Sequence, residues 1–153
     1  MKAISLIQPW AWLVTAGSKR IENRTWHLPK SMIGQTVLIH ASKTDPRKFP
    51  DVHKFMEFVG LREDIPSEAF SMRGGVVGWA KIGGCLCPHN TMVVDGYDLR
   101  WWMKDQHGFL LEKVGVLPFT PCSGRMGFFD LDLSFDELKS DVAPMEQPQL
   151  KLW

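Results

Sequence analysis

The segment 8-QPWAWLVTAGSKRIENRTW-26 changes its periodicity halfway along and predicts a helix that leads directly into a strand. Pro9 suits the first position of a helix, where no backbone N–H is needed. Trp10, Leu13 and Val14 then follow the i, i+3, i+4 spacing of one apolar helix face. Gly17 is placed to end this helix in a left-handed conformation.

The second half of the segment follows the two-residue period of a strand. In an extended chain, Arg20, Glu22, Arg24 and Trp26 share one face. Lys19 stands at the bend before them. A carboxylate between two guanidinium groups, with an indole at the end, is typical of a site for a planar, anionic ligand.

Length and composition favour one domain with no global basic field. The chain has 153 residues, 44% of them hydrophobic, and a formal net charge of +1. We expect a single domain over residues 1–140 and a C-terminal tail over 141–153. Binding of nucleic acid would therefore have to depend on a local basic patch. No segment approaches the ~18 uninterrupted apolar residues of a membrane span, and we expect no membrane partner.

The three cysteines are an odd number, which favours a reducing cytoplasm over a disulfide framework. Cys85, Cys87 and His89 stand at one-residue spacings, outside the usual separation of zinc ligands. We expect neither a metal nor another cofactor.

The remaining pattern predicts several strands and short helices. Glycine pairs at 74–75 and 83–84 indicate bends or bulges in a strand. Ser134 and Glu137 fit a capping box. Residues 88–107 are undecided, apart from one or two helical turns at 98–104. The expected strands are 36–41, 76–86, 108–116 and 128–133, the expected helices are 50–60 and 67–70, and the expected loop is 117–127. Glycine-punctuated strands without regular strand–helix alternation predict an α+β fold, a partly open β-barrel of about five to six strands with flanking short helices.

Several sequence elements together resemble the ASCH domain, a family with a PUA-like barrel fold. They are S-L-x-Q-P-W at 5–10, G-x-K-x-x-E-x-R at 17–24, I-H-A-S at 39–42, G-V-V-G-W-A at 75–80 and P-x-x-G-x-x-G-F at 121–128. The resemblance implies a cleft, lined by the segment G-x-K-x-x-E-x-R, that binds RNA or a modified nucleotide. It leaves open two enzymatic alternatives, hydrolysis of an N-acylated nucleoside such as acetylcytidine and cleavage of single-stranded RNA. A protein-interaction module without a ligand is a further alternative, and the oligomeric state is left open.

Candidate site residues follow from the motifs and from this resemblance. Lys19 and Glu22 are the candidate catalytic residues. Glu22 stands where the amidohydrolase branch of the family carries a nucleophilic threonine, and it would act instead as a general base on water. The candidate ligand-binding residues are Gln8, Trp10, Arg24, Trp26, His40, Ser42, Lys43, Ser123 and Arg125. Ser123 and Arg125 belong to a glycine-containing loop that suits a phosphate.

Each candidate also has a purely structural interpretation. Lys19, Glu22 and Arg24 would form an ordinary surface ion-pair ladder. A tryptophan is more often a core residue than a stacking platform. His40, at the end of a buried strand, would be satisfied by a backbone carbonyl.

Overall fold

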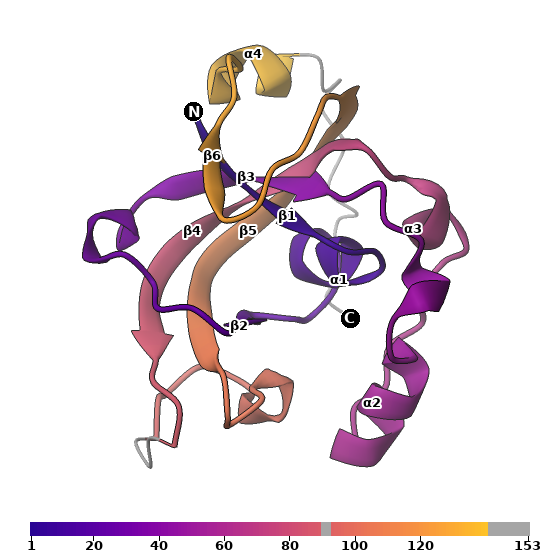
Figure 1. Ribbon diagram of the computed structural model, residues 1–153, viewed down its shortest axis with the longest axis vertical. Coiled ribbons are helices and arrows are strands. Elements are labelled where there is room, and N and C mark those ends of the chain that lie inside the picture. Colours follow the sequence, from indigo (N-terminus) through magenta and orange to yellow (C-terminus); the bar gives the residue numbers. More distant parts are fainter. Residues whose placement is uncertain (90–92, 141–153) are drawn as a thin grey trace, which may run out of the picture.

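Two long antiparallel strands, β4 (Gly75–Leu86) and β5 (His107–Pro121), form the frame of the sheet (Figure 1). The structure is a computed structural model and describes residues 1–89 and 93–140. The shorter strands are β1 (Lys2–Leu6), β2 (Ile21–Arg24), β3 (Thr36–Ala41) and β6 (Phe128–Asp130). The helices are α1 (Trp10–Thr15), α2 (Val52–Val59), α3 (Glu68–Ser71) and α4 (Phe135–Ser140), with 3-10 turns η1 (Lys30–Met32), η2 (Pro46–Lys48) and η3 (Leu99–Trp101).

The six strands curl into a partly open barrel. Their order is β2-β5-β4-β3-β1-β6, with β1 and β3 parallel and the other pairs antiparallel. Although β2 and β6 are opposite edges, Trp26 lies just after β2 and its ring centroid is 5.5 Å from that of Phe128 in β6. Arg24 Nη2 also donates to the Ser5 carbonyl of β1 at 2.6 Å. Side chains therefore cross a seam that no strand pairing closes, and the predicted α+β barrel of five to six strands is confirmed.

The glycine pair at 83–84 coincides with an irregularity of β4, whereas the pair at 74–75 does not. The register against β5 shifts between Lys81 and Ile82, between Ile82 and Gly84, and, near the other end of β4, between Val76 and Gly78. At Gly78 an added Cβ would lie 2.4 Å from Thr15 Cγ2, so the missing side chain allows α1 to pack closely on the sheet. This contact holds α1 against β4.

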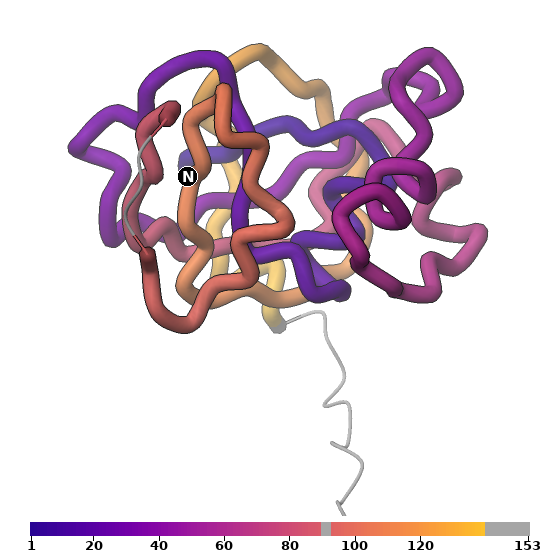
Figure 2. Tube along the Cα trace, turned by 90° about the horizontal axis from the view of Figure 1, so that it is seen from below, coloured from indigo at the N-terminus to yellow at the C-terminus, as the bar shows by residue number. Residues whose placement is uncertain are grey.

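The core fills the barrel and extends under α1 and α2. The barrel interior contains Leu6, Val37, Ile39, Ile82 and Phe109, each less than 3% exposed. The segment that contains α2 and α3 lies to one side of the barrel (Figure 2).

The predicted helix at 50–60 is confirmed as α2. The Asp51 carboxylate accepts from the backbone N–H of His53 at its N-terminus, and Gly60 ends it at φ 75°. Phe55 packs edge-on against Trp10 of α1, with ring centroids 5.5 Å apart.

The capping box before α4 is also confirmed. The backbone N–H of Glu137 donates to Ser134 Oγ, and the backbone N–H of Ser134 donates to the Glu137 carboxylate.

The structure corrects several local predictions. The strand expected over 128–133 is shorter, because β6 ends at Asp130. Gly17 is not among the residues with positive φ; it is constrained instead by a close approach, because an added Cβ would lie 2.6 Å from Glu63 Oε1. Strand β5 does not end at Val116 but continues to Pro121, so the predicted loop shortens to residues 122–127. Pro118 is tolerated because three residues of β5 stand opposite one residue of β4 there, and no ladder hydrogen bond is required of it.

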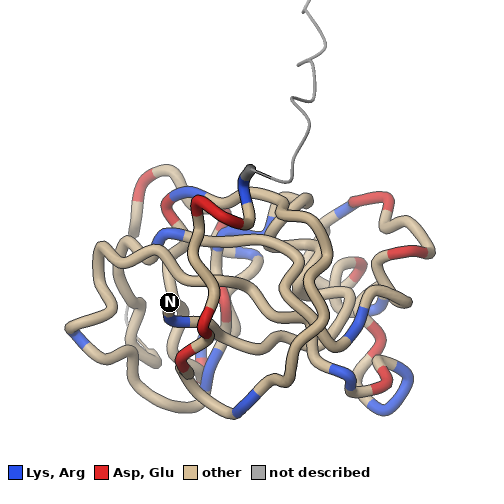
Figure 3. The backbone as a smooth tube through the Cα atoms, turned by 90° about the horizontal axis from the view of Figure 1, so that it is seen from above, with Lys and Arg blue, Asp and Glu red and all other residues tan. Residues whose placement is uncertain are grey.

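In the region 88–107, which the sequence left undecided, the turn η3 lies within the predicted helical turns at 98–104. Residues 90–92 and the predicted tail at 141–153 lie outside the described residues. Among the described residues, no helix is both long and apolar enough to cross a bilayer. Charged residues of both signs are interspersed around the chain (Figure 3), in keeping with the small net charge.

Candidate functional site

A cavity of about 540 Å³ opens at the barrel seam, and we name it the cationic cleft. It is bordered by the end of β3, the residues after β2 and the loop 122–127. Its lining is Ser5, Ile7, Arg24, Trp26, His40, Ser42, Lys43, Thr44, Ser123, Gly124, Arg125, Met126 and Gly127. Seven predicted site residues from separate segments of the chain therefore meet in one place.

The chemistry of this lining is one-sided. Arg24, Lys43 and Arg125 supply three cations, and none of the described residues that line the cleft is acidic. Serine and threonine hydroxyls add neutral donors and acceptors. Such a set suits an anion with several oxygen atoms.

Trp26 forms the aromatic part of the wall and is half-buried. Its ring packs edge-on against Phe109 and Phe128, which hold the indole in place. The Arg24 guanidinium carbon lies 5.9 Å from its ring centroid. A fixed, partly exposed indole beside cations can stack on a nucleobase while the cations contact a phosphate.

A second cavity of about 430 Å³ adjoins the cleft, and we name it the Glu22 groove. The two cavities share Ser5, Ile7 and Arg24. The full lining of the groove is Ser5, Leu6, Ile7, Trp10, Glu22, Asn23, Arg24, Phe49, Pro50, Phe55, Met103 and Gln106. Trp10 therefore belongs to the groove and not to the cationic cleft.

Lys19, Glu22 and Arg24 form a charge cluster that lies mostly inside the protein. Their side chains are 2%, 12% and 21% exposed. Lys19 Nζ donates to Glu22 Oε2 at 2.6 Å and also to the carbonyl oxygen of Ile21. On the other side, Arg24 Nε lies 3.2 Å from Glu22 Oε1, an ion-pair contact that lacks hydrogen-bond geometry. Both Glu22 oxygens are thus held by cations.

Burial lowers the pKa of Lys19, while the Glu22 carboxylate opposes this shift. Lys19 is not part of either cavity lining, so it supports Glu22 from behind. Arg20, which the two-residue period placed on the same face as Glu22, precedes β2 and does not join the charge cluster. The Arg20 guanidinium turns back and donates to the carbonyls of Val14 and Gly17 at the end of α1, where those groups need partners.

His40 is buried at 1% exposure and uses both ring nitrogens. Nε2 lies 3.0 Å from the Cys122 carbonyl, which can only accept, so Nε2 is assigned the proton. In the neutral ring, Nδ1 then accepts from the Ser5 hydroxyl at 2.8 Å. The structural interpretation of His40 thus holds at Nε2, and the other nitrogen faces a hydroxyl that lines both cavities.

Gly124 allows the loop 122–127 to cover this pair. An added Cβ there would lie 2.4 Å from His40 Cε1 and 2.6 Å from Ser5 Oγ. The loop can therefore bring Ser123 and Arg125 over the cleft only because residue 124 has no side chain.

Two further predicted residues, Ser42 and Gln8, make mainly structural contacts. Ser42 Oγ lies 2.8 Å from Thr44 Oγ1 and accepts from its backbone N–H, which shapes the turn that carries Lys43. Gln8 is 2% exposed, accepts from the Trp12 N–H and donates to the Met72 carbonyl. It lines a different cavity of about 320 Å³, beside Trp10, and is not in the cationic cleft.

Ser5 is the main residue that was not among the sequence candidates. The signal was present, because Ser5 opens the motif S-L-x-Q-P-W, but only the pairing of β1 with β3 places it opposite His40.

The fold and this cleft define a partly open barrel with a cationic site at its seam. Residues 4–117 match the family model described as the ASCH domain, and the chain belongs to that family. Among solved structures, the chain resembles a serine-to-alanine mutant of ZmASCH from Zymomonas mobilis (15% identity, 78% of this chain and 72% of that chain, TM-score 0.45). It also resembles a tyrosine-to-phenylalanine mutant of the same protein (14% identity, 95% and 85%, TM-score 0.44). A comparison with curated protein sequences finds no match.

Proposed function

We propose that the protein binds single-stranded RNA, or a nucleotide derived from it, in the cationic cleft. The observation that carries this proposal is the lining itself: three cations, several hydroxyls, one fixed indole and no acidic side chain among the described lining residues. Arg125 and Lys43 would each contact a phosphate of the strand. A base would stack on Trp26.

The dimensions support a small ligand in preference to a duplex. A cavity of about 540 Å³ is within the range of small-molecule sites, ~300–1,000 Å³. Because charges of both signs surround the rest of the chain (Figure 3), we expect affinity to depend on these few contacts and not on a broad basic surface.

The test is titration of a fluorescently labelled single-stranded RNA at several salt concentrations. The Lys43→Ala/Arg125→Ala double variant should weaken binding and reduce the slope of log affinity against log salt by about 1.4, since each missing cation removes one phosphate contact worth ~0.7 on a single strand. A double variant Lys30→Ala/Lys113→Ala removes the same charge from exposed positions outside the cleft and should bind as the wild type does.

Equal losses in the two double variants would show that binding depends on net charge and would contradict the proposal. Trp26→Leu adds a test of stacking. It should reduce affinity by about 1–3 kcal/mol without changing the salt slope. An unchanged affinity would remove Trp26 from the site.

A second candidate function, hydrolysis of an N-acylated nucleoside, is favoured by the Ser5–His40 hydrogen bond. By the resemblance, Glu22 occupies the position at which the amidohydrolase branch has a threonine nucleophile, so that position offers no hydroxyl. Ser5 supplies a hydroxyl in the same pair of cavities, with His40 Nδ1 2.8 Å away to take its proton. The Cys122 carbonyl fixes the His40 ring, as the third group of a catalytic triad does.

The corresponding reaction has two steps. Ser5 Oγ would attack the acyl carbon while its proton passes to His40 Nδ1; the C–N bond then breaks, and the proton is delivered to the departing amine. Water would hydrolyse the resulting serine ester by the same proton transfers, which restores the Ser5 hydroxyl and releases the free acid.

Mass spectrometry of separate reactions with N4-acetylcytidine and with single-stranded RNA distinguishes the candidates. Loss of turnover in Ser5→Ala, with turnover kept in Glu22→Gln, would identify the serine mechanism. The reverse result would support Glu22 as a general base on water. If the wild type binds the nucleoside or RNA and releases no acid and no shortened RNA, binding is the function and both enzymatic candidates fail.

A further inference from the structure

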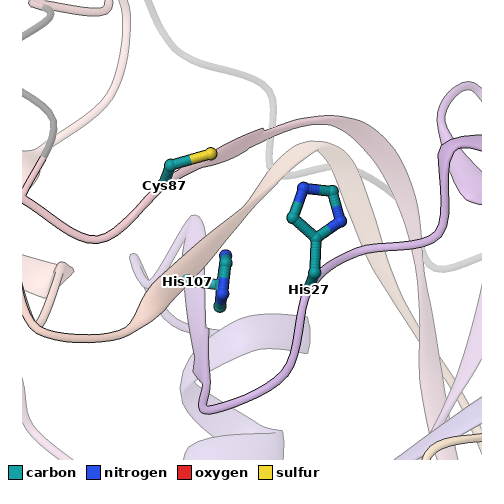
Figure 4. A group of neighbouring side chains, drawn as sticks. All are labelled: His27, Cys87 and His107. Atoms are coloured by element: carbon teal, nitrogen blue, oxygen red, sulfur yellow. The ribbon is translucent and has the colours of Figure 1, made fainter.

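Three potential metal ligands that are not part of the family motifs meet where β2 and β4 end and β5 begins. His27 follows β2, Cys87 follows β4 and His107 begins β5 (Figure 4). Their ligand atoms all lie within 4.8 Å of one another. Figure 4 shows the three side chains around a common space, with the Cys87 sulfur directed toward His27. None of them has a role in the cationic cleft or the Glu22 groove.

The spacing is close to what a tetrahedral zinc ion requires. Zn–N distances of ~2.0–2.1 Å and Zn–S of ~2.3 Å put the N–N and N–S pairs of a tetrahedral site about 3.3–3.6 Å apart. Ligand atoms within 4.8 Å of one another therefore need to approach by at most about 1.5 Å. His27 and Cys87 are exposed, so rotamer changes can provide this movement without disturbing the core.

A second observation concerns His107. Its Nδ1 atom is buried and has no hydrogen-bond partner among the described residues. A buried imidazole nitrogen without a partner is energetically costly, and coordination of a metal through Nδ1 would satisfy it. The two histidine rings lie edge to face, with centroids 5.2 Å apart, so neither ring blocks the other from the shared space.

We infer that His27, Cys87 and His107 form a binding site for a zinc-type divalent ion. Two imidazoles and one thiolate are ligands that Zn²⁺ accepts in proteins, and three protein ligands leave the fourth position for water. The site would join three segments that no single strand pairing holds together.

Its position links it to the cleft. His27 follows Trp26 directly, and His107 is the cross-strand partner of Arg24. A bound ion would therefore anchor the segment that presents Arg24 and Trp26 to the cleft. This inference needs no RNA to be tested, so it stands or falls separately from the proposed function.

The experiment is metal binding by the full chain after removal of metal with a chelator. We expect one Zn²⁺ per chain by elemental analysis and competition with a chromophoric chelator. Co²⁺ should give a near-ultraviolet thiolate charge-transfer absorption. Cys87→Ser should abolish that absorption, and His27→Ala, an exposed change that leaves the core intact, should weaken Zn²⁺ affinity about 100-fold or more.

Cys122→Ser is the matched control, because Cys122 is a half-buried free thiol next to the cationic cleft, on the loop side of the sheet. It should bind Zn²⁺ and Co²⁺ as the wild type does. Unchanged Zn²⁺ affinity in both Cys87→Ser and His27→Ala would overturn the inference. So would equal losses in Cys87→Ser and Cys122→Ser, since these would indicate binding by any available thiol.

Discussion

The charge cluster and the cationic cleft adjoin each other, but charges are neutralised within the protein only in the cluster. In the cluster, Lys19 and Arg24 neutralise Glu22, and the three side chains are 2–21% exposed. In the cleft, Lys43 and Arg125 face a space that has no acidic side chain among its described lining. The first arrangement is complete within the protein. In the second, the anion that balances the charge would be the proposed ligand.

The difference indicates which part of the family motif supports structure and which part is available to a ligand. Disruption of a buried ion pair destabilises the folded protein strongly, because removal of one partner leaves the other charge without compensation. Exposed cations contribute little to stability and are free to bind. Lys19 and Glu22 should therefore affect folding most strongly, and Lys43 and Arg125 should affect binding.

The largest effect is expected for Lys19→Met. This change keeps the apolar stem of the side chain but leaves Glu22 without its 2.6 Å partner and the Ile21 carbonyl without its donor. We expect the free energy of unfolding to fall by about 3–5 kcal/mol, measured by urea denaturation. Lys43→Ala is the control and should change it by less than about 0.5 kcal/mol.

A double variant tests whether the loss comes from the stranded carboxylate. In Lys19→Met/Glu22→Gln the charge that lost its partner is also removed, so the double variant should be more stable than Lys19→Met alone. If the stability loss of the double variant equals the sum of the losses of Lys19→Met and Glu22→Gln alone, the two residues are not coupled and the charge cluster is a set of independent contacts.

The same lysine predicts a dependence of stability on pH. Burial lowers the pKa of Lys19 below its ordinary value of 10.5. Between the folded-state pKa and 10.5, the unfolded chain holds a proton that the folded chain lacks, so the free energy of unfolding rises with pH in that window. The stability difference between the wild type and Lys19→Met should increase as pH approaches 10.5; a difference that shrinks would mean that the ion pair with Glu22 outweighs burial.

A smaller effect is expected for Gly124→Ala on the side of the cleft. The new Cβ would lie 2.4 Å from a His40 ring that is 1% exposed and cannot move aside. The loop must shift instead, at a cost of about 1–3 kcal/mol, and RNA affinity should fall because Arg125 moves with it. Gly84→Ala is the control: its Cβ would meet Leu110 at an ordinary 3.5 Å, and both stability and RNA binding should remain near those of the wild type. An unchanged affinity in Gly124→Ala would separate the loop from the site.

Much of the fold was predictable because local patterns agreed with tertiary structure. Strand β3 has the predicted bounds of Thr36–Ala41, and α2 lies between its expected cap and Gly60. The sequence ended β5 too early, at Val116, because a proline such as Pro118 usually marks the end of a strand. In the structure, a bulge opposite Val77 accommodates Pro118 within β5. Such a bulge depends on the partner strand and leaves no mark in the sequence of β5.

The candidate site was predictable in membership but not in arrangement. Sequence spacing put Glu22 and Arg24 on one face, as the structure does, but could not show that Lys19 is buried beneath them and that Arg20 caps a helix. Ser5 meets His40 only through the parallel pairing of β1 and β3, across 35 residues. His27, Cys87 and His107 likewise come together only through the curvature of the sheet, so no spacing motif could identify them.

Arg24 belongs to both regions, and Arg24→Lys tests where one ends and the other begins. Lysine keeps the charge but loses the planar fork with which Arg24 reaches the Ser5 carbonyl at 2.6 Å and Glu22 at 3.2 Å. We expect a loss of about 1 kcal/mol in unfolding free energy, less than for either change above. The salt slope of RNA binding should stay the same, because the number of cations facing the phosphate is unchanged. A lower slope with unchanged stability would mean that the Arg24 guanidinium serves the ligand alone, and the boundary between the charge cluster and the cationic cleft would then lie at Glu22.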